Sequence, residues 1–203
     1  MCAARKLDEA KREEIAMGAL EVLRNRGLHN TSMSEIARSL EIKRPTLYWY
    51  FADIEAIFLW ILDHTHEKLA RYIAGQLIGV DHPLDALLIL IRAEHEFFAA
   101  EGLQDFTVFL AQFLAMGSVA DRERFRALVV RNVVASRGLL IAMIDQGIAD
   151  GRVAPVDAAQ LVDFMQTVLD GSFLRVALYP EHADIEGLLA FVDQTVLAPL
   201  RRP

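Results

Sequence analysis

Apolar residues recur at helical spacing along nearly the whole chain, and no stretch alternates as a strand would. A first helix is expected from about Asp8 to Arg26, where Gly27 ends it. Its buried face should hold Ile15, Ala19, Val22 and Leu23. Breaks at glycine and proline separate the later helices, expected over residues 54–78, 83–100, 103–116, 119–149, 157–178 and 184–200. The pattern predicts an all-α protein.

Two short helices joined by a tight turn are expected between the first helix and residue 54. Ser32 and Glu35 have the spacing of a capping box, so one helix should begin at Met33. Leu47 and Phe51 then lie one turn apart on the second helix, where they can close over a small shared core. The residues left facing outward are Lys43, Arg44, Thr46, Tyr48, Trp49 and Tyr50. Cations followed by aromatic hydroxyls are the chemistry of a helix laid in the major groove of DNA.

These segments resemble the N-terminal domain of the TetR family of bacterial transcriptional regulators. The resemblance is carried by residues 27–32 (GLHNTS), 36–37 (IA) and 44–51 (RPTLYWYF), and it extends over about residues 10–58. It implies a homodimer that acts as a repressor, binds a palindromic double-stranded DNA operator and is released from it by a small-molecule effector, which we expect to be apolar or aromatic. It also implies two domains, a three-helix helix-turn-helix DNA-binding domain at 1–52 and a larger helical ligand-binding and dimerisation domain at 53–203.

Side chains of the second short helix and of the turn before the first are the candidate DNA contacts. Arg44 and Thr46 lie near the start of the helix, where side chains reach base edges. Tyr48 and Tyr50 can donate their hydroxyls to phosphates, and Trp49 either contacts DNA or belongs to the core. The full predicted set is Thr31, Ser32, Lys43, Arg44, Thr46, Tyr48, Trp49 and Tyr50.

Two positions depart from the family pattern. Glu41 replaces the usual turn glycine, which costs about 1 kcal/mol if the backbone there is left-handed. Ile54 replaces a lysine that reaches a phosphate, while Asp53 before it remains a good N-cap. Lys43 can supply the missing charge, but the sequence does not decide whether it does.

Charge is distributed unevenly along the 203 residues. The net charge of −7 is split between residues 1–51, at +2, and residues 52–203, at −9. A mildly basic head on an acidic body fits a protein that touches DNA at one end, although chance charge on a solvated first helix is the alternative. A membrane span needs about 20 apolar residues and none is present, so no membrane is expected. A single cysteine, Cys2, expected in a terminal tail, and the absence of a signal-like start favour a cytoplasmic protein.

Aromatic residues concentrate in the larger domain. Phe106, Phe109 and Phe113 form one helical stripe, which is either core or the wall of a ligand cavity. Asp63 and Glu94 would add affinity for a cationic ligand if they face inward. The predicted ligand-binding residues are Trp60, His64, His95, Phe98, Phe109, Gln112, Phe113, Met116, Met143 and Gln166.

The last two helices carry wide apolar stripes, with Gly171 allowing close approach. They form either an ordinary intrachain core or, as the resemblance implies, a four-helix bundle with a second copy. We expect the dimer, because two operator half-sites require a two-fold protein. The predicted interface residues are Leu161, Phe164, Met165, Val168, Ser172, Phe173, Leu188, Phe191, Val192 and Thr195.

Motifs for catalysis or metal binding are not evident. His64 and His66 are two apart and so lie on different helix faces, while Asp63 and His66 make one weak pair. No metal or other cofactor is expected, and without a phosphate loop or nucleophile elbow no enzymatic activity is expected. Two alternatives to the regulator remain: a helical small-molecule-binding protein with a degenerate DNA-binding head, and a protein-interaction module built on the acidic body.

Overall fold

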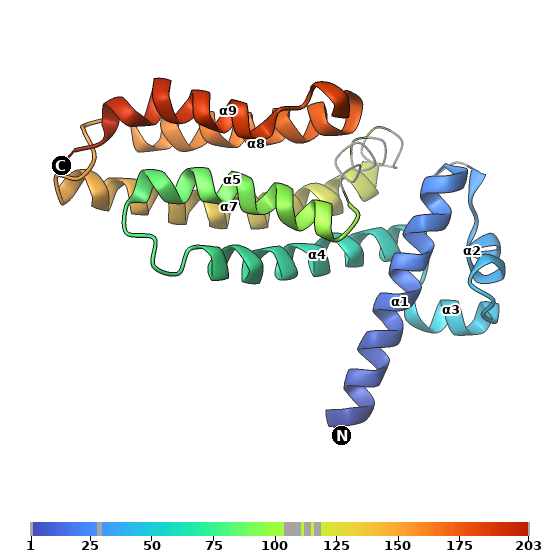
Figure 1. Cartoon of the computed structure of the whole chain (residues 1–203). Coiled ribbons are helices and arrows are strands. Elements are labelled where there is room, and N and C mark those ends of the chain that lie inside the picture. Colours follow the sequence, from blue (N-terminus) through green and yellow to red (C-terminus); the bar gives the residue numbers. More distant parts are fainter. Residues whose placement is uncertain (1, 28–29, 104–110, 112–114, 116–118, 203) are drawn as a thin grey trace. The chain divides into compact units, whose positions relative to one another are not determined.

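The computed structural model describes residues 2–27, 30–103, 111, 115 and 119–202, and these residues are almost wholly helical (Figure 1). Within them the one β contact is an isolated bridge between Val153 and Arg201. The predicted all-α class is confirmed. The helices are α1 (Cys2–Arg26), α2 (Met33–Ser39), α3 (Arg44–Tyr50), α4 (Ile54–Gln76), α5 (Pro83–Ala100), α7 (Val119–Ala149), α8 (Ala158–Leu178) and α9 (Ile185–Val192).

The chain forms two compact units. The first comprises the chain through Glu67 together with the start of α7 through Phe125, and the second comprises the remainder. Helices α4 and α7 therefore each contribute to both units. The predicted domain boundary at residues 52 and 53 stays a prediction, since these units are defined by packing and not by function.

The first unit, which we call the head, is built on the short helices α2 and α3. Ser32 caps α2 and shares a complete capping box with Glu35, as predicted. Leu47 and Phe51 are buried together, which confirms the expected small core. Leu40 packs directly against Gly18 of α1. A Cβ at position 18 would come within 2.6 Å of the Leu40 Cδ2 atom, so this close contact depends on the glycine. The buried core residues of the head are Ile15, Ala16, Ala19, Leu20, Leu23, Met33, Ile36, Ala37, Leu47, Phe51, Ile57, Phe58 and Ile61.

The second unit, which we call the body, packs α5, α7, α8 and α9 alongside one another (Figure 1). Both α5 and α8 begin with a side-chain cap, from His82 and Asp157 respectively. The fully buried residues of this core are Leu84, Leu87, Ile91, Ile144, Val153, Ala158, Leu161, Val162, Met165, Leu169, Phe173, Leu189, Val192 and Leu197. One apolar stripe from each helix meets here, so the body has a core of its own.

The observed helices differ from the expected ones at the start of α1 and at the end of the last helix. Helix α1 begins at Cys2, so the prediction that Cys2 lies in a tail is wrong. The last helix was expected to reach residue 200, but the α-helix ends at Val192 and continues as a π turn and a 3₁₀ turn. Pro199 explains this change, because it has no N–H to donate to the carbonyl four residues earlier. The helix expected over residues 103–116 falls almost wholly outside the described residues.

Candidate functional site

Helix α3 presents large aromatic side chains to solvent. Trp49 is 67% exposed and Tyr48 is 47% exposed, so Trp49 is not a core residue. The Arg44 guanidinium lies 5.9 Å from the centre of the Tyr48 ring, within range of a cation–π contact. Lys43 is also exposed and caps the helix through its backbone alone. Two exposed cations and two exposed aromatic rings therefore share one short helix.

Two other predicted DNA contacts, Thr31 and Ser32, have structural roles, and a third, Thr46, is partly covered. Thr31 is buried and its hydroxyl donates to the carbonyl of Gly27 at 2.9 Å. Ser32 remains exposed while its side chain caps α2. Thr46 is half-buried on α3. Backbone N–H groups at the start of a capped helix can contact phosphate, so Ser32 keeps a position suited to DNA even though its side chain is used.

Tyr50 differs from Tyr48 in where its hydroxyl goes. It is half-buried, and the carboxylate of Asp8 on α1 lies close to its hydroxyl. Burial first, and then that carboxylate, raise the pKa of Tyr50 above its usual value. Tyr50 thus lies where α3 faces Asp8 of α1, and it is less exposed than Tyr48.

The two departures from the family pattern have clear structural outcomes. Glu41 has φ of 55°, which is the left-handed conformation considered from the sequence. Asp53 accepts a hydrogen bond from the backbone N–H of Ala56 at 2.7 Å, so its predicted role as N-cap of α4 is confirmed. Ile54 is the first residue of α4 and is half-buried. Its side chain adds no cation beside the N-terminus of this helix.

Trp60 and His64, predicted to bind ligand, belong to the head. The His64 ring stacks on Trp60 with centroids 4.5 Å apart, and its Nε2 lies 3.3 Å from a Glu13 carboxylate oxygen. The Arg12 guanidinium lies 5.7 Å from the centre of the Trp60 ring and 5.1 Å from the centre of the Phe51 ring. These contacts join α1 to α4 within the head. Their role as ligand contacts stays a prediction.

His95 and Phe98 are predicted ligand residues that the structure does bring together, in the body. Both rings contact Phe173, His95 by stacking at 4.2 Å and Phe98 edge-on at 5.1 Å. Ser172 donates its hydroxyl to the Leu169 carbonyl, so the 2.7 Å contact with His95 must use a proton on His95 Nε2. Burial lowers the pKa of His95, consistent with a neutral ring. Because this hydroxyl is a donor to the backbone and an acceptor from the ring, the pair is not arranged to activate a nucleophile.

Two hollows in the described part of the body are lined by predicted ligand residues. A groove between α5, α7 and α8 encloses about 10 Å³ and is lined by Leu87, Leu90, Ile91, Leu140, Val162, Met165, Gln166 and Leu169. Gln166 is a predicted ligand residue, and it donates to the Asp170 carboxylate at 3.0 Å. The four remaining predicted ligand residues, Phe109, Gln112, Phe113 and Met116, lie outside the described residues.

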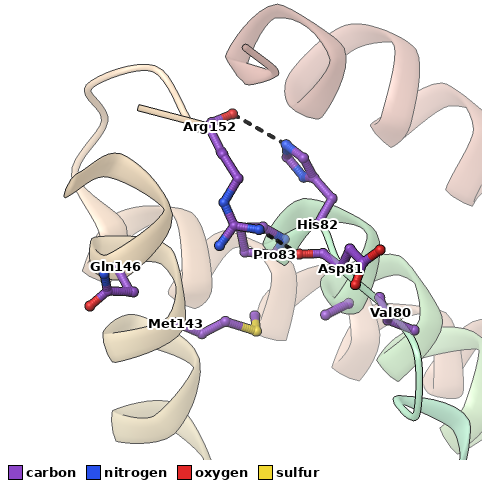
Figure 2. A pocket seen from close by; sticks show the side chains of 8 residues that line it. Val80, Asp81, His82, Pro83, Met143, Gln146 and Arg152 are labelled. Atoms are coloured by element: carbon purple, nitrogen blue, oxygen red, sulfur yellow. Dashed lines mark hydrogen bonds between the residues drawn. The ribbon is translucent and has the colours of Figure 1, made fainter. Parts of the chain in front are cut away.

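The second hollow is a more open pocket of about 170 Å³ that contains Met143, another predicted ligand residue (Figure 2). Its polar groups are engaged with one another. His82 Nε2 contacts the Arg152 carbonyl at 3.2 Å, and the Arg152 guanidinium donates to the Asp81 carbonyl at 2.7 Å. Arg152 also donates to Asp150. These hydrogen bonds join the loop before α5 to the loop after α7, and residues of both loops line the pocket.

An apolar face of α8 and α9 points away from the body core. Phe164 is 43% exposed and Phe191 is 65% exposed, and Leu174 and Leu178 accompany them. Val168 and Leu188 are half-buried, and Thr195 is exposed. Half of the predicted interface residues are instead buried inside the subunit, and their place in an interface stays a prediction: Leu161, Met165, Ser172, Phe173 and Val192. Both sides of α8 are apolar, so the sequence did not distinguish them. The exposed fractions of the side chains show which side faces the core. We call the exposed set Phe164, Leu174, Leu178 and Phe191 the outer face.

The described residues show two further features. None of their helices is both long and apolar enough to cross a membrane. They contain no group of three or more histidine, cysteine, aspartate or glutamate side chains able to hold a metal ion.

A two-helix motif with an exposed cationic and aromatic second helix, followed by a helical body, defines a DNA-binding regulator of the helix-turn-helix class. Residues 15–61 match the model for bacterial regulatory proteins of the tetR family. Residues 95–201, more than half of the chain, match the C-terminal model of BetI-type transcriptional repressors. The chain belongs to the TetR family and is a ligand-responsive DNA-binding transcriptional regulator.

Individual relatives agree over nearly full length. The HTH-type transcriptional regulator BetI of Rhizobium meliloti is 27% identical over 199 residues, which cover 96% of this chain and 92% of BetI. HbdR of an Aromatoleum species is 26% identical, with 95% and 84% covered. Among solved structures, the fold is similar to PfmR from Thermus thermophilus (24% identity, TM-score 0.69, 95% and 98% covered). It is also similar to FadR from Bacillus subtilis in complex with stearoyl-CoA (16%, 0.74, 93% and 99%).

Proposed function

We propose that this regulator is a dimeric repressor whose two heads bind the half-sites of a palindromic operator. The observation that carries the proposal is the exposed surface of α3, where Arg44 and Lys43 stand beside Tyr48 and Trp49. The Trp49 ring contacts Tyr50 edge-on at 5.5 Å and is otherwise open to solvent, where duplex DNA offers it a further contact.

Within α3, Arg44 reads a base edge, preferably guanine, and Tyr48 donates to a phosphate. Trp49 makes an apolar contact, for which the methyl group of thymine is suited. Tyr50 contributes indirectly, because its half-buried side chain beside Asp8 helps to hold α3 against α1. Asp8 belongs to the residues that position the reading helix.

The dimer forms through the outer face of α8 and α9. Four large apolar side chains exposed on adjacent helices exceed what a monomer keeps in water without function, and a two-fold axis would bury them against their own copies. The residues of this proposed interface are Phe164, Val168, Leu174, Leu178, Leu188, Phe191 and Thr195.

The effector acts by shifting a population between two spacings of the heads. Successive major grooves on one side of a duplex lie about 34–36 Å apart, and a dimer with another head spacing cannot contact both half-sites. The effector enters the body, where His95 and Phe98 are gathered beside Phe173. We further propose that the protein acts in the cytoplasm and catalyses no reaction, which the hydrogen-bond directions at Ser172 support.

Selection of bound duplexes from a random pool tests this proposal. We expect the full-length protein to enrich an inverted repeat with half-site centres about one helical turn apart, at salt concentrations near physiological. Enrichment of a single unpaired half-site would contradict the dimer. Failure to enrich any sequence, with only salt-sensitive general binding, would favour a small-molecule-binding protein with a degenerate head.

A further inference from the structure

The open pocket of the body lies where the loop before α5 meets the end of α7 and the loop after it (Figure 2). It encloses about 170 Å³ and is lined by Val80, Asp81, His82, Pro83, Ala86, Met143, Gln146 and Arg152. Sites for drug-sized ligands have about 300–1,000 Å³, so this pocket suits a smaller molecule. None of its residues lines the groove between α5, α7 and α8, and the pocket is therefore a separate site.

Close packing around Gly147 of α7 fixes the walls of this pocket. A Cβ at position 147 would lie 2.7 Å from Pro83 Cγ and 2.9 Å from Val153 Cγ2, so α5 and the loop after α7 both pack against this glycine. The Gly147 carbonyl also accepts hydrogen bonds from the backbone N–H groups of Arg152 and Val153, at 2.9 and 3.0 Å. The pocket is thus formed before a ligand enters, which lowers the cost of binding.

Apolar side chains make up half of the lining. They belong to Val80, Pro83, Ala86 and Met143. In Figure 2 the Met143 side chain points from α7 across the pocket toward Val80. A flexible, polarizable thioether adapts to aliphatic groups of different shape, so this surface suits a small aliphatic group.

Two charged groups of opposite sign also line the pocket, and they do not neutralise each other. The Arg152 guanidinium donates to the main-chain carbonyl of Asp81 at 2.7 Å, and not to its carboxylate. Its other hydrogen bond goes to Asp150 at 3.2 Å, so three of its five N–H groups have no partner among the described residues. The Asp81 carboxylate is exposed and likewise has no hydrogen bond or ion pair with a described residue.

The remaining polar residues of the pocket are partly committed. His82 accepts from the N–H of Leu84 through Nδ1 and contacts the Arg152 carbonyl through Nε2, so both of its ring nitrogens are used. Gln146 donates to Asp150 at 2.8 Å, which leaves its amide oxygen as an acceptor. The pocket therefore offers a ligand one cationic donor, one anionic acceptor and one neutral acceptor.

The two charged groups are close enough to hold one small molecule between them. Arg152 is bonded to the carbonyl of the same residue that carries the carboxylate, so guanidinium and carboxylate are separated by no more than the length of Asp81 itself. An α-amino acid carries its ammonium and its carboxylate on one carbon and can contact both. An anion alone would face the unpaired Asp81, and a cation alone would face the unpaired Arg152.

We propose that this pocket binds a small α-amino acid with an aliphatic side chain, which places its carboxylate on Arg152, its ammonium on Asp81 and its side chain against Met143. The amide oxygen of Gln146 accepts a further hydrogen bond from the ammonium group. The bound ligand joins the loop before α5 to the loop after α7. This inference goes beyond the proposed function, because neither operator binding nor the effector region beside His95 requires this pocket.

Calorimetry on the full-length protein tests the proposal with L-leucine and two analogues that each lack one charge, leucinamide and isocaproate. We expect leucine to bind at least tenfold more tightly than either analogue. Arg152→Gln should weaken leucine binding at least tenfold and remove the preference over leucinamide, which has no carboxylate. Asp81→Asn should likewise remove the preference over isocaproate, which has no ammonium group. Asp145→Asn, which removes an exposed carboxylate of α7 outside the pocket, should change neither preference.

Three results would overturn the proposal: no binding of leucine at millimolar concentration, equal affinity for leucine and one of its analogues, or unchanged leucine affinity in either pocket variant. Circular dichroism shows whether each variant is folded, and the comparison of analogues on the wild type needs no substitution. Operator binding without amino acid is the separate readout. If the wild type binds leucine but no DNA, the pocket stands and the repressor function falls. If it binds DNA but no leucine, the reverse holds.

Discussion

Helix α3 of the head and the outer face of the body leave aromatic side chains almost equally exposed, yet they suit different partners. Trp49 is 67% exposed and Phe191 is 65% exposed. Around Trp49 stand Arg44, Lys43 and the hydroxyl of Tyr48, whereas the outer face is otherwise leucine and phenylalanine. Exposure alone does not name a partner. The polar groups that accompany the exposed rings indicate the kind of partner, because a polyanion needs donors and cations while a second apolar surface needs neither.

The largest effect should come from placing a charge on the outer face. Phe191→Glu puts a carboxylate opposite its own copy in the proposed bundle, which should cost roughly 3–5 kcal/mol of dimer stability. Sedimentation should show a monomer with retained helical circular dichroism and weak operator binding. The matched control is Leu139→Glu on α7, a leucine 74% exposed outside this face, which should remain dimeric. A dimeric Phe191→Glu protein would place the interface elsewhere.

The second prediction concerns the free energy of unfolding, which should depend on the protonation of Glu94 in the body and not in the head. The pKa of Glu94 is raised from 4.5 to about 8, so the folded body binds this proton more tightly than the unfolded chain does. Stability should be full below pH 4.5 and should fall by about 2–4 kcal/mol as pH rises through 8. Glu94→Gln should remove this loss.

The two tryptophans give a direct readout of this difference. Trp49 and Trp60 both belong to the head unit, so their fluorescence reports its unfolding, while far-ultraviolet circular dichroism reports both units. In urea titrations we expect the pH dependence assigned to Glu94 in the circular dichroism transition of the body. An equal pH dependence in tryptophan fluorescence that Glu94→Gln removes would mean that the two units unfold together.

The third prediction concerns the polar groups around Trp49. Arg44→Ala should cost about 1–3 kcal/mol and relax preference at one operator position. Tyr48→Phe should weaken all sequences about equally, because a phosphate contact carries no sequence information. Competition binding on the selected operator and on scrambled duplexes distinguishes the two. Equal losses on both duplexes from Arg44→Ala would show that another side chain reads the base.

The smallest effect is expected at Ile54, the first residue of α4. Ile54→Lys adds a cation at a helix start already capped by Asp53, and the plot of log affinity against log salt should steepen by about one unit per half-site. Binding should tighten mainly at low salt. An unchanged slope would indicate that Lys43 already neutralises that phosphate.

Local rules of sequence determined much of this molecule. The capping box of Ser32 and Glu35, the limits of α5 and α7, the buried pair Leu47 and Phe51, and the family resemblance all depend on spacings of a few residues. A cap or a helical face is specified within one or two turns, so it can be predicted without knowledge of the rest of the chain. The start of α1 and the π turn after Val192 were missed, although Pro199 gave a local signal for the second.

Tertiary packing decided which side of each helix is inside. Phe164 and Phe173 read alike in the sequence, but α5 covers Phe173 while Phe164 is left outside, because α8 is apolar on both sides. The same holds for Tyr48 and Tyr50, which differ because Tyr50 is half-buried and has Asp8 of α1 close to its hydroxyl. Whether Glu94 faces inward was left open from the sequence, and its apolar neighbours at i−4, i−3, i+3 and i+4 could have answered this. Its raised pKa could not, since it comes first from burial among other helices and then from the charge of Asp170, seventy-six residues away on α8.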